Sequence, residues 1–354
     1  MQDFVKALFA DPDVNSTHRL AAVNSINWAR ILAQITYYFA SYFTLVRSLP
    51  SSDSTPQVRF VVPTGNFGDI LAGYFAKRMG LPAERLVIAT NENDILHRFW
   101  RSGHYEKKAV HGREAEGGFP EDGAKAHEDG VKETLAPAMD ILVSSNFERL
   151  LWYLSYRVYG SGSVTERRKV AGDKVKGWLN QLKSEGGFGV EDAVLKAAKE
   201  DFESERVSDK ETIEIITKTF VSTSSPPSLS SAEAKTKGTI QDGHYILDPH
   251  SAIGIGAALR SCSRTGSETH HIALATAHPA KFSSAVELAL GKEKGFSFEK
   301  VLPDEFVGLE TMERRCTIVK NGAGWEDVRE IVREEVEAEM KGKASDGPGQ
   351  ETKG

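Results

Sequence analysis

The chain has 354 residues, a length that suits two α/β lobes, or one large lobe with additions, better than one small core. Its formal net charge is -6, with 50 acidic against 44 basic residues, which leaves no positive excess to follow a phosphate backbone and argues against a nucleic-acid partner. The two cysteines give neither a disulfide framework nor zinc spacing, no apolar run reaches the roughly 20 residues of a membrane span, and the start lacks the order of a signal peptide. We therefore expect a cytoplasmic protein without a membrane partner.

The first long predicted element is a helix over residues 26–46. Because this segment carries so little polar surface, we expect it to be a largely buried core helix. Its apolar side chains at helical spacing are Trp28, Ile31, Leu32, Ile35, Phe39, Phe43 and Val46.

A βαβ unit follows, with an apolar strand over residues 58–62, a helix over 69–80 and a second buried strand over 85–90. The segments 137–145 and 271–279 read as further strands, and the second leads into a helix. The fold class expected is therefore α/β, with a mostly parallel sheet and flanking helices.

Stretches of other character separate these elements. Residues 208 to 211 form a capping-box pattern, Ser-Asp-Lys-Glu, that opens a helix. The expected organisation is core α/β with the strand-turn-helix (1–102), a polar insertion (103–130), more core (131–163), a helical insert (164–221), a flexible linker (222–240), core α/β with the C-terminal helix (241–341) and a disordered tail (342–354).

The turn Thr-Gly-Asn-Phe-Gly, residues 64–68, joins the first strand to its helix. Several backbone N–H groups should meet there at the positive end of the helix dipole, where a phosphate dianion is stabilised. Gly65 and Gly68 let the backbone approach the anion, while Asn66 and Thr64 offer an amide and a hydroxyl. A tight turn whose glycines serve geometry alone is the alternative. Since Asp69 stands where a P-loop would need lysine, nucleoside triphosphates are disfavoured.

Six blocks, in this order, closely resemble threonine synthases of the fungal and bacterial long-chain type: "NSINWARILAQITYYF", "PTGNFGDILAGYFAKRMGLP", "IATNENDIL", "PAMDILVSSNFERLLWYL", "ILDPHSAIG" and "TAHPAKF". The resemblance covers the chain from about residue 3 to the last block. It implies a pyridoxal-phosphate enzyme of fold type II, the tryptophan-synthase-β-like fold. Such an enzyme converts O-phosphohomoserine and water to L-threonine and phosphate.

The resemblance also implies roles for residues. The cofactor phosphate would be held by Thr64, Gly65, Asn66, Phe67 and Gly68. The hydroxyl of Thr276 would face the pyridine nitrogen, and a neutral hydroxyl does not hold that nitrogen protonated as a carboxylate would.

One departure from the family is serious. Threonine synthases carry their Schiff-base lysine in a Ser-Phe-Lys-Asp block of the N-terminal region, and this sequence has no such block. Lys77 lies in a predicted helix and Lys281 in the last block, so neither is a credible replacement. We therefore expect a truncated chain without a catalytic residue of its own, inactive alone. The alternatives are a non-catalytic α/β module that binds a phosphorylated metabolite and a threonine-synthase-like phospholyase.

Three histidines near the last predicted strand could be taken for a metal site, but a structural role is favoured. His270 and His271 are neighbours on a predicted strand and should point to opposite faces, so no bound metal is expected with them and His278. His250 follows Asp-Pro and is read as a helix-start contact that could line the site.

Other polar residues have equally plain readings. Residues 91–94 could meet a substrate or simply cap a helix. Asn24, Ser25 and Asn27 open the first long helix, where the resemblance hints at closeness to the cofactor and capping is the alternative. Arg149 is read as a surface salt bridge.

Overall fold

The structure is a computed structural model that describes residues 2–18, 24–50, 55–107, 125–126, 130–223, 239–241, 243–314, 316–320 and 322–345. Most of the predicted polar insertion, linker and tail lie outside these residues, and the first four residues of the predicted tail belong to the last helix. No described helix combines the length and apolar character that a membrane crossing requires.

The chain divides into two compact units, residues 1–23 with 308–354 and residues 24–307. The first contains α1 (Gln2–Ala10), α2 (Pro12–Thr17), a 3-10 helix η7 (Leu309–Thr311) and α12 (Trp325–Ser345), the last of which is the predicted C-terminal helix. The second contains the sheet and the candidate site.

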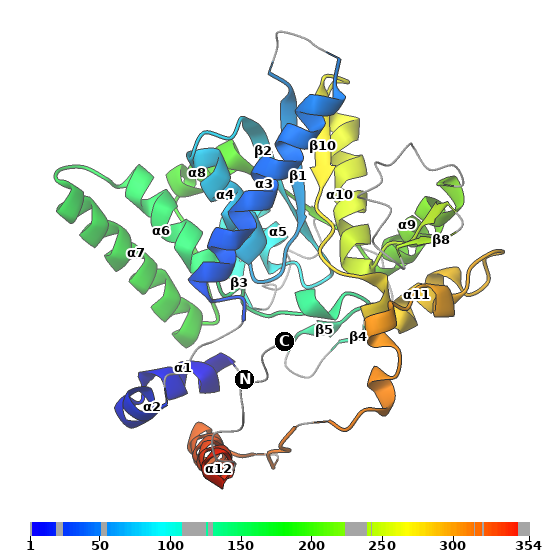
Figure 1. Ribbon diagram of the computed structural model, residues 1–354. Helices are drawn as coiled ribbons and strands as arrows, with labels where there is room; N and C mark the ends of the chain where they lie inside the picture. Colours follow the sequence, from blue (N-terminus) through cyan, green and yellow to red (C-terminus); the bar gives the residue numbers. More distant parts are fainter. Residues whose placement is uncertain are drawn as a thin grey trace, which may run out of the picture. The chain divides into compact units, whose positions relative to one another are not determined.

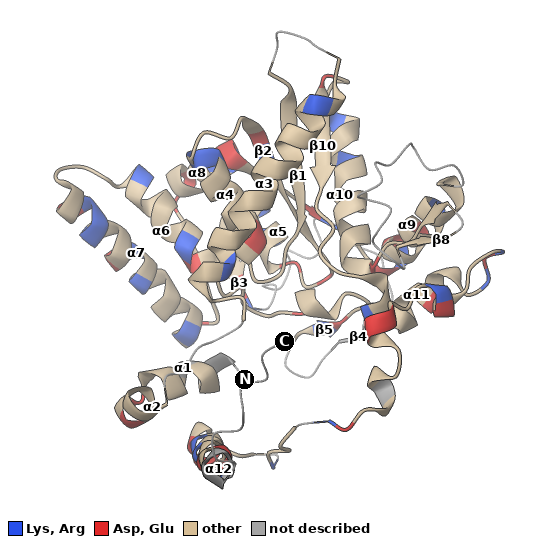
Figure 2. Cartoon of the chain, viewed as in Figure 1, with Lys and Arg blue, Asp and Glu red and all other residues tan. Residues whose placement is uncertain are grey.

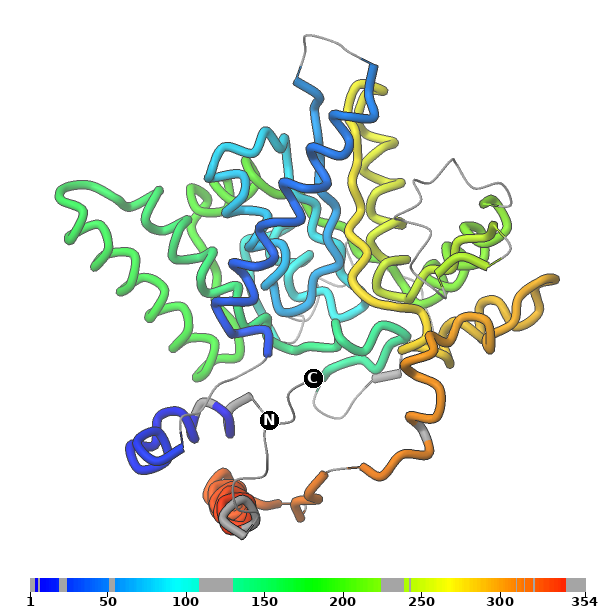
Figure 3. The backbone as a smooth tube through the Cα atoms, in the orientation of Figure 1, coloured from blue at the N-terminus to red at the C-terminus, as the bar shows by residue number. Residues whose placement is uncertain are grey.

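Among the described residues, the central sheet of the second unit has four parallel strands in the order β10-β1-β2-β7. Strands β1 and β10 are neighbours although they are far apart in sequence, as Figure 3 shows in blue and yellow. The structure confirms the predicted strands 58–62 and 85–90 and their parallel pairing. The strand predicted over 271–279 is β10, which ends at Ala273 and so is shorter than expected. The bounds are β1 (Gln57–Pro63), β2 (Ala83–Thr90), β7 (Phe202–Arg206) and β10 (Thr269–Ala273).

Helices cover both faces of this sheet, with α3 and α4 along one and α10 along the other (Figure 1). Side chains alternate along β1, so Phe60 and Val62 belong to the core cluster with α3 and α4, whereas Val61 packs with Ile253 of α10. Because both faces are buried, the strands are nearly continuous apolar runs, and most charged residues lie on helices and loops (Figure 2).

The remaining elements surround the sheet. The helices are α3 (Trp28–Ser48), α4 (Gly68–Arg78), α5 (Ile95–Ser102), α6 (Phe147–Val158), α7 (Val164–Ser184), α8 (Asp192–Asp201), α9 (Asp209–Ser222), α10 (Pro249–Arg264) and α11 (Ser283–Leu290). Short strands are β3 (His104–Glu106), β4 (Lys125–Ala126), β5 (Lys132–Glu133), β6 (Gly187–Gly189), β8 (Ile240–Gln241) and β9 (His244–Tyr245), and 3-10 helices are η2 (Pro137–Met139), η4 (Pro279–Phe282), η5 (Phe298–Lys300) and η6 (Asp304–Phe306).

The segment predicted as a helical insert contains more than helices. The capping box is confirmed, since the Ser208 hydroxyl accepts from the Glu211 N–H and the Glu211 carboxylate accepts from the Ser208 N–H. However, β7 lies inside the same range and pairs with β2 at the edge of the main sheet. Its sequence, Phe-Glu-Ser-Glu-Arg, lacks the apolar run of a central strand, as suits a strand that has one neighbour within the described part of the chain.

The strand predicted over residues 137–145 is wrong. The structure has the short η2 and a series of turns there. The Asp140 carboxylate explains the difference, since it accepts hydrogen bonds from the Thr134 N–H at 2.9 Å and the Thr134 hydroxyl at 2.7 Å and so folds the chain into a loop.

The prediction that α3 is largely buried is also wrong. Ile31, Tyr38 and Tyr42 are buried against the core, but a neighbouring apolar stripe is exposed. Apolar residues at helical spacing predict an apolar helix. They do not show which of two adjacent apolar faces is buried against the rest of this chain. The exposed fractions along the stripe are 44% for Trp28, 49% for Leu32, 51% for Phe43 and 37% for Val46.

The amino ends of the strands are joined by a partly buried charge network. The Arg59 guanidinium of β1 donates two hydrogen bonds of 2.8 and 2.6 Å to the Glu84 carboxylate of β2 and one of 3.1 Å to Glu203 of β7. Ser261 of α10 donates to Glu203 at 2.7 Å and contacts His271 of β10 at 3.0 Å. One guanidinium therefore ties three strands together at the end of the sheet opposite the candidate site.

Candidate functional site

The turn of residues 64–68 lies where β1 ends and α4 begins. Phe67 has φ of 64° and is the N-cap residue of α4, so a left-handed residue redirects the chain into the helix. The turn thus sits at the carboxyl edge of the parallel sheet, where ligands of such sheets bind.

Hydrogen bonds from a distant segment hold the carbonyl groups of this turn. The Ser144 hydroxyl donates to the Gly65 carbonyl at 2.7 Å, and Asn146 donates to the Asn66 carbonyl from its backbone at 3.1 Å and its side chain at 2.9 Å. No described residue accepts a hydrogen bond from the N–H groups of residues 65 to 69. Donors without acceptors at a helix N-terminus form a site for an anion.

The two glycines of the turn have different environments. A Cβ on Gly65 would stand 3.1 Å from the Met139 Cα and 3.2 Å from the Ala138 carbonyl oxygen, so this glycine allows η2 to approach. A Cβ on Gly68 would have its nearest neighbour at 3.5 Å, an ordinary contact. Close packing therefore requires glycine at position 65 and not at position 68.

The side chains of the turn are largely committed to the protein. The Thr64 hydroxyl donates to the Val62 carbonyl at 2.6 Å, and the Asn66 side-chain oxygen accepts from the Ser145 hydroxyl at 3.0 Å. Phe67 is buried in an aromatic cluster with Trp100, Phe147 and Phe202. The chemistry that the turn offers is consequently that of its backbone.

Thr276 follows β10, which is the parallel neighbour of β1, so it lies at the same edge of the sheet as the turn. It is exposed, and its N–H donates to the Ser251 hydroxyl at 3.2 Å. The residues that the sequence analysis assigned to a phosphate and to a ring nitrogen thus belong to the ends of adjacent strands.

A buried polar cluster at the start of α10 was not assigned from the sequence. Asp248 caps the helix, and His250 places Nδ1 3.0 Å from the Asp248 carboxylate. The Ala138 N–H donates to His250 Nε2 at 3.2 Å, which makes Nδ1 the protonated nitrogen. The predicted helix-start role of His250 is confirmed, and the Asp-Pro opening of the helix was the signal for the capping carboxylate.

Asp69 lies in the first turn of α4, beside the anion site. It accepts hydrogen bonds from the hydroxyls of Tyr37 and Tyr38 of α3, the second at 2.9 Å. Burial raises the pKa of the Asp69 carboxyl and of both tyrosine hydroxyls.

Residues 91–94 brace a loop. The side-chain amides of Asn91 and Asn93 both donate to Asp140, at 2.7 and 2.9 Å. Asp94 is the N-cap residue of α5 and pairs with Arg98 at 2.9 Å. These contacts hold the segment that leads into η2.

The start of α3 lies against the anchor of the turn. Asn27 caps α3 by accepting from the Ala29 N–H at 2.9 Å, and the Ser25 carbonyl accepts from the Asn146 side chain at 2.9 Å. The expected surface salt bridge of Arg149 is wrong. Its guanidinium donates to the Ile26 carbonyl at 2.9 Å and lies 5.4 Å from the Trp28 ring centre.

The histidines near β10 have structural partners. His271 contacts Ser261 at 3.0 Å, and burial lowers its pKa. His278 accepts from the Ala280 N–H at 3.1 Å and begins η4. Within the described residues, no group of three or more His, Cys, Asp or Glu side chains is placed to hold a metal ion.

Lys77 lies in the last turn of α4, at the end of the helix away from the turn. It pairs with Asp201 at 2.8 Å and donates to the Glu84 carbonyl at 2.7 Å. Lys281 is exposed in η4. Lys77 is therefore occupied by a structural ion pair.

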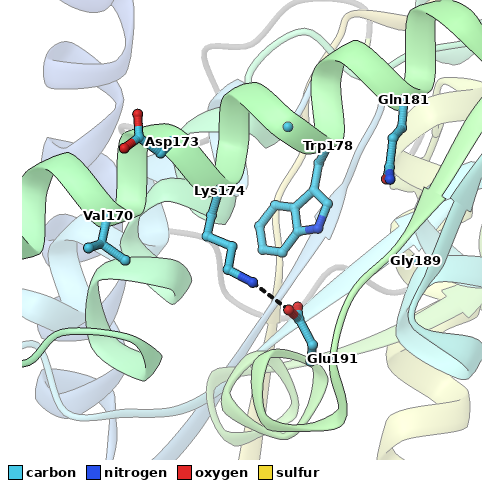
Figure 4. A pocket seen from close by; sticks show the side chains of 8 residues that line it. Val170, Asp173, Lys174, Trp178, Gln181, Gly189 and Glu191 are labelled. Carbon is cyan, nitrogen blue, oxygen red and sulfur yellow. Dashed lines mark hydrogen bonds and ion pairs between the residues drawn. The ribbon is translucent and has the colours of Figure 1, made fainter.

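A cavity of about 550 Å³ lies elsewhere, between α7 and the start of α8. Figure 4 shows Lys174 reaching Glu191 beside the Trp178 ring, and that ion pair measures 2.6 Å. None of the residues assigned to the cofactor lines it. Its paired charges offer no anion cradle comparable with that of the turn.

Comparisons with known proteins point to one enzyme family. A family model described as "Threonine synthase, C-terminal" matches residues 251–332. Threonine synthase of Saccharomyces cerevisiae is 46% identical over 342 residues, which are 96% of this chain and 58% of the relative. The chain is a homologue of threonine synthases. The Pseudomonas aeruginosa threonine synthase is 40% identical over 90% of this chain and 54% of its own length, and the human "Threonine synthase-like 2" is 33% identical over 91% and 54%.

Solved threonine synthase structures confirm the expected α/β fold class with its parallel sheet. The crystal structure from yeast has a TM-score of 0.72 at 45% identity, covering 95% of this chain and 57% of that one. The pyridoxal-phosphate-bound threonine synthase from Brucella melitensis has a TM-score of 0.63 at 37% identity, covering 94% and 56%. The chain therefore spans less than three fifths of the length of these threonine synthases.

Proposed function

We propose that this chain is the part of a threonine synthase that holds the phosphate of pyridoxal phosphate. In the intact enzyme it would serve the conversion of O-phosphohomoserine and water to L-threonine and phosphate. The observation that carries the proposal is the turn of residues 64–68. The Gly65 and Asn66 carbonyls are anchored, and the N–H groups of residues 65 to 68 have no acceptor among the described residues.

The residues present fit this cofactor. The N–H groups of Gly65, Asn66, Phe67 and Gly68, with Thr64 beside them, would bind the phosphate dianion at the positive end of α4. Thr276, at the same edge of the sheet, would offer its hydroxyl to the pyridine nitrogen without protonating it. When bound, the cofactor supplies an electron sink for reaction at the substrate carbons, and the protein supplies binding and orientation.

Within this proposal no lysine of the chain is assigned as the Schiff-base lysine. The Ser-Phe-Lys-Asp block of the family is absent from the sequence, and Lys77 is held in an ion pair at the far end of α4. The chain alone would therefore bind the cofactor without a covalent bond and would not turn over substrate. The expected partners are small molecules in the cytoplasm.

Binding of pyridoxal phosphate to the purified chain tests the proposal. We expect saturable binding that inorganic phosphate competes with, weakened about tenfold or more by Gly65→Ala, because the added Cβ would push η2 and the turn apart. Gly177→Ala is the matched control, because a Cβ there meets nothing within 4 Å.

Borohydride treatment separates the two parts of the proposal. A covalent adduct on one specific lysine would refute the assignment of no Schiff-base lysine. Absence of any binding by the unaltered chain would refute the cofactor assignment.

The same assay distinguishes one of the two alternatives, and the other needs a substrate test. A phosphometabolite-binding module would bind simple phosphate esters as tightly as pyridoxal phosphate. A threonine-synthase-like phospholyase, a possibility raised by the human relative, would differ in substrate and not in the turn. Only the intact enzyme, supplied with O-phosphohomoserine, separates that alternative from threonine synthase.

A further inference from the structure

One buried carboxylate, that of Asp248, stands between the two parts of the proposed cofactor site. Its exposed fraction is 1%, and its position at the N-cap of α10 gives it the backbone N–H groups of His250 and Ser251 at 2.9 and 3.3 Å. It also takes hydrogen bonds from the side chains of the same two residues. A carboxylate with this many donors is firmly fixed in orientation.

The first arm of the cluster leads to the phosphate turn. Oδ1 of Asp248 accepts from His250 Nδ1 at 3.0 Å, and His250 Nε2 accepts from the Ala138 N–H at 3.2 Å. The backbone of Ala138 and Met139 in turn packs on Gly65. The orientation of the His250 ring therefore sets the position of η2, and η2 forms a wall of the turn.

The second arm leads to Thr276. Oδ2 of Asp248 accepts from the Ser251 hydroxyl, and the Ser251 oxygen accepts from the Thr276 N–H at 3.2 Å. This bond fixes the backbone of the residue whose hydroxyl is assigned to the pyridine nitrogen. His250 and Ser251 are each only 4% exposed, so their hydrogen bonds to Asp248 lie away from water.

We propose that Asp248 is a positioning residue that sets the phosphate turn and Thr276 at a fixed separation through His250 and Ser251. The inference rests on the proposed function, because it concerns the two ends of the same cofactor. A rigid ligand gains from both ends only if their spacing matches its length, so the shared carboxylate preorganises the site for the whole cofactor.

The test compares three probes on the full chain: pyridoxal phosphate, inorganic phosphate and pyridoxal, which lacks the phosphate. We expect His250→Gln to weaken pyridoxal phosphate and inorganic phosphate by a similar factor and to leave pyridoxal unchanged. Ser251→Ala should weaken pyridoxal phosphate severalfold and leave inorganic phosphate unchanged, and Ser251→Thr, which keeps the hydroxyl, should restore binding. Asp248→Asn should show both losses.

Hydrogen exchange supplies a readout that needs no cofactor. Exchange of the Ala138 amide should rise in His250→Gln only, exchange of the Thr276 amide in Ser251→Ala only, and both in Asp248→Asn. If Asp248→Asn does not fold, the two single-arm variants still decide the question.

The outcomes separate the inference from the proposed function. If the unaltered chain binds neither pyridoxal phosphate nor inorganic phosphate, the proposed function fails and this inference fails with it. If the unaltered chain binds both and each variant weakens all three probes equally, in proportion to a fall in melting temperature, the residues are merely structural and this inference alone is overturned.

Discussion

Replacement of Gly73 by alanine should destabilise the chain because this glycine, in the middle of α4, lets the Tyr38 ring of α3 pack directly on the α4 backbone. A Cβ there would lie 2.6 Å from Cε1 and 2.7 Å from Cζ of Tyr38. Tyr38 is fully buried and donates to Asp69 at 2.9 Å, so the ring has no open space to enter.

The magnitude follows from two opposing terms. Overpacking of this kind costs about 1–3 kcal/mol, and displacement of the Tyr38 hydroxyl loses hydrogen bonds of about 1 kcal/mol each. Alanine gains about 0.5–1 kcal/mol over glycine in a helix interior. We expect a net loss of about 2 kcal/mol for Gly73→Ala. Gly177→Ala in α7, where a Cβ meets nothing within 4 Å, should show the helix gain alone.

Urea denaturation of the two alanine variants, with amide exchange along α4 as a local measure, decides the matter. Tyr38→Leu removes the obstructing ring, so Gly73→Ala should cost less in that background than in the unaltered chain. A Gly73→Ala variant as stable as Gly177→Ala would refute the reasoning, because the predicted clash with Tyr38 would then cost no stability.

Three further predictions concern charge and exposure. Arg59→Met should lower the free energy of unfolding by about 2 kcal/mol because it removes a cation from the largely buried Glu203 carboxylate, and the double variant with Glu203→Gln should lose less; equal losses in urea denaturation would contradict the network. Burial raises the pKa of Asp69 above 3.8, so the native state binds its proton more tightly, and stability should fall as pH rises from 3.8 through the native pKa. Asp69→Asn should flatten that slope, and a steeper slope in urea midpoints would contradict the pKa direction. Phe43→Glu, on the exposed stripe of α3, should change the free energy of unfolding by less than about 0.5 kcal/mol and reduce aggregation in light scattering; a loss above about 2 kcal/mol would show that the stripe is covered.

Local signals were enough to predict the centre of the fold. The apolar runs of β1 and β2 and the stop after α4 are properties of consecutive residues, and the structure confirms them. β7 escaped prediction because an edge strand with one neighbour carries glutamates at positions that a central strand would fill with apolar residues. The apolar residues after Pro137 were likewise predicted as a strand. The loop found there depends on hydrogen bonds between Asp140 and the preceding Thr134, and the sequence of the segment does not show these bonds.

The site was predictable only in part, for a similar reason. The glycine turn is a local pattern, so residues 64–68 were singled out from the sequence. Its anchors Ser144 and Asn146 are about 80 positions away along the chain, and no pattern within the turn points to them. The link from Asp248 to both ends of the site likewise exists only in three dimensions.

The ion pairs of Arg59 with Glu84 and Glu203 limit which substitutions this end of the sheet can tolerate. Each of the three residues sits on a different strand, and Arg59 is the cation that the two carboxylates share. Loss of either glutamate leaves Arg59 paired with the other, whereas loss of Arg59 removes a cation from the largely buried Glu203. A designer who repacks this end of the sheet should therefore exchange Arg59 and Glu203 together, and position 84 can vary more freely.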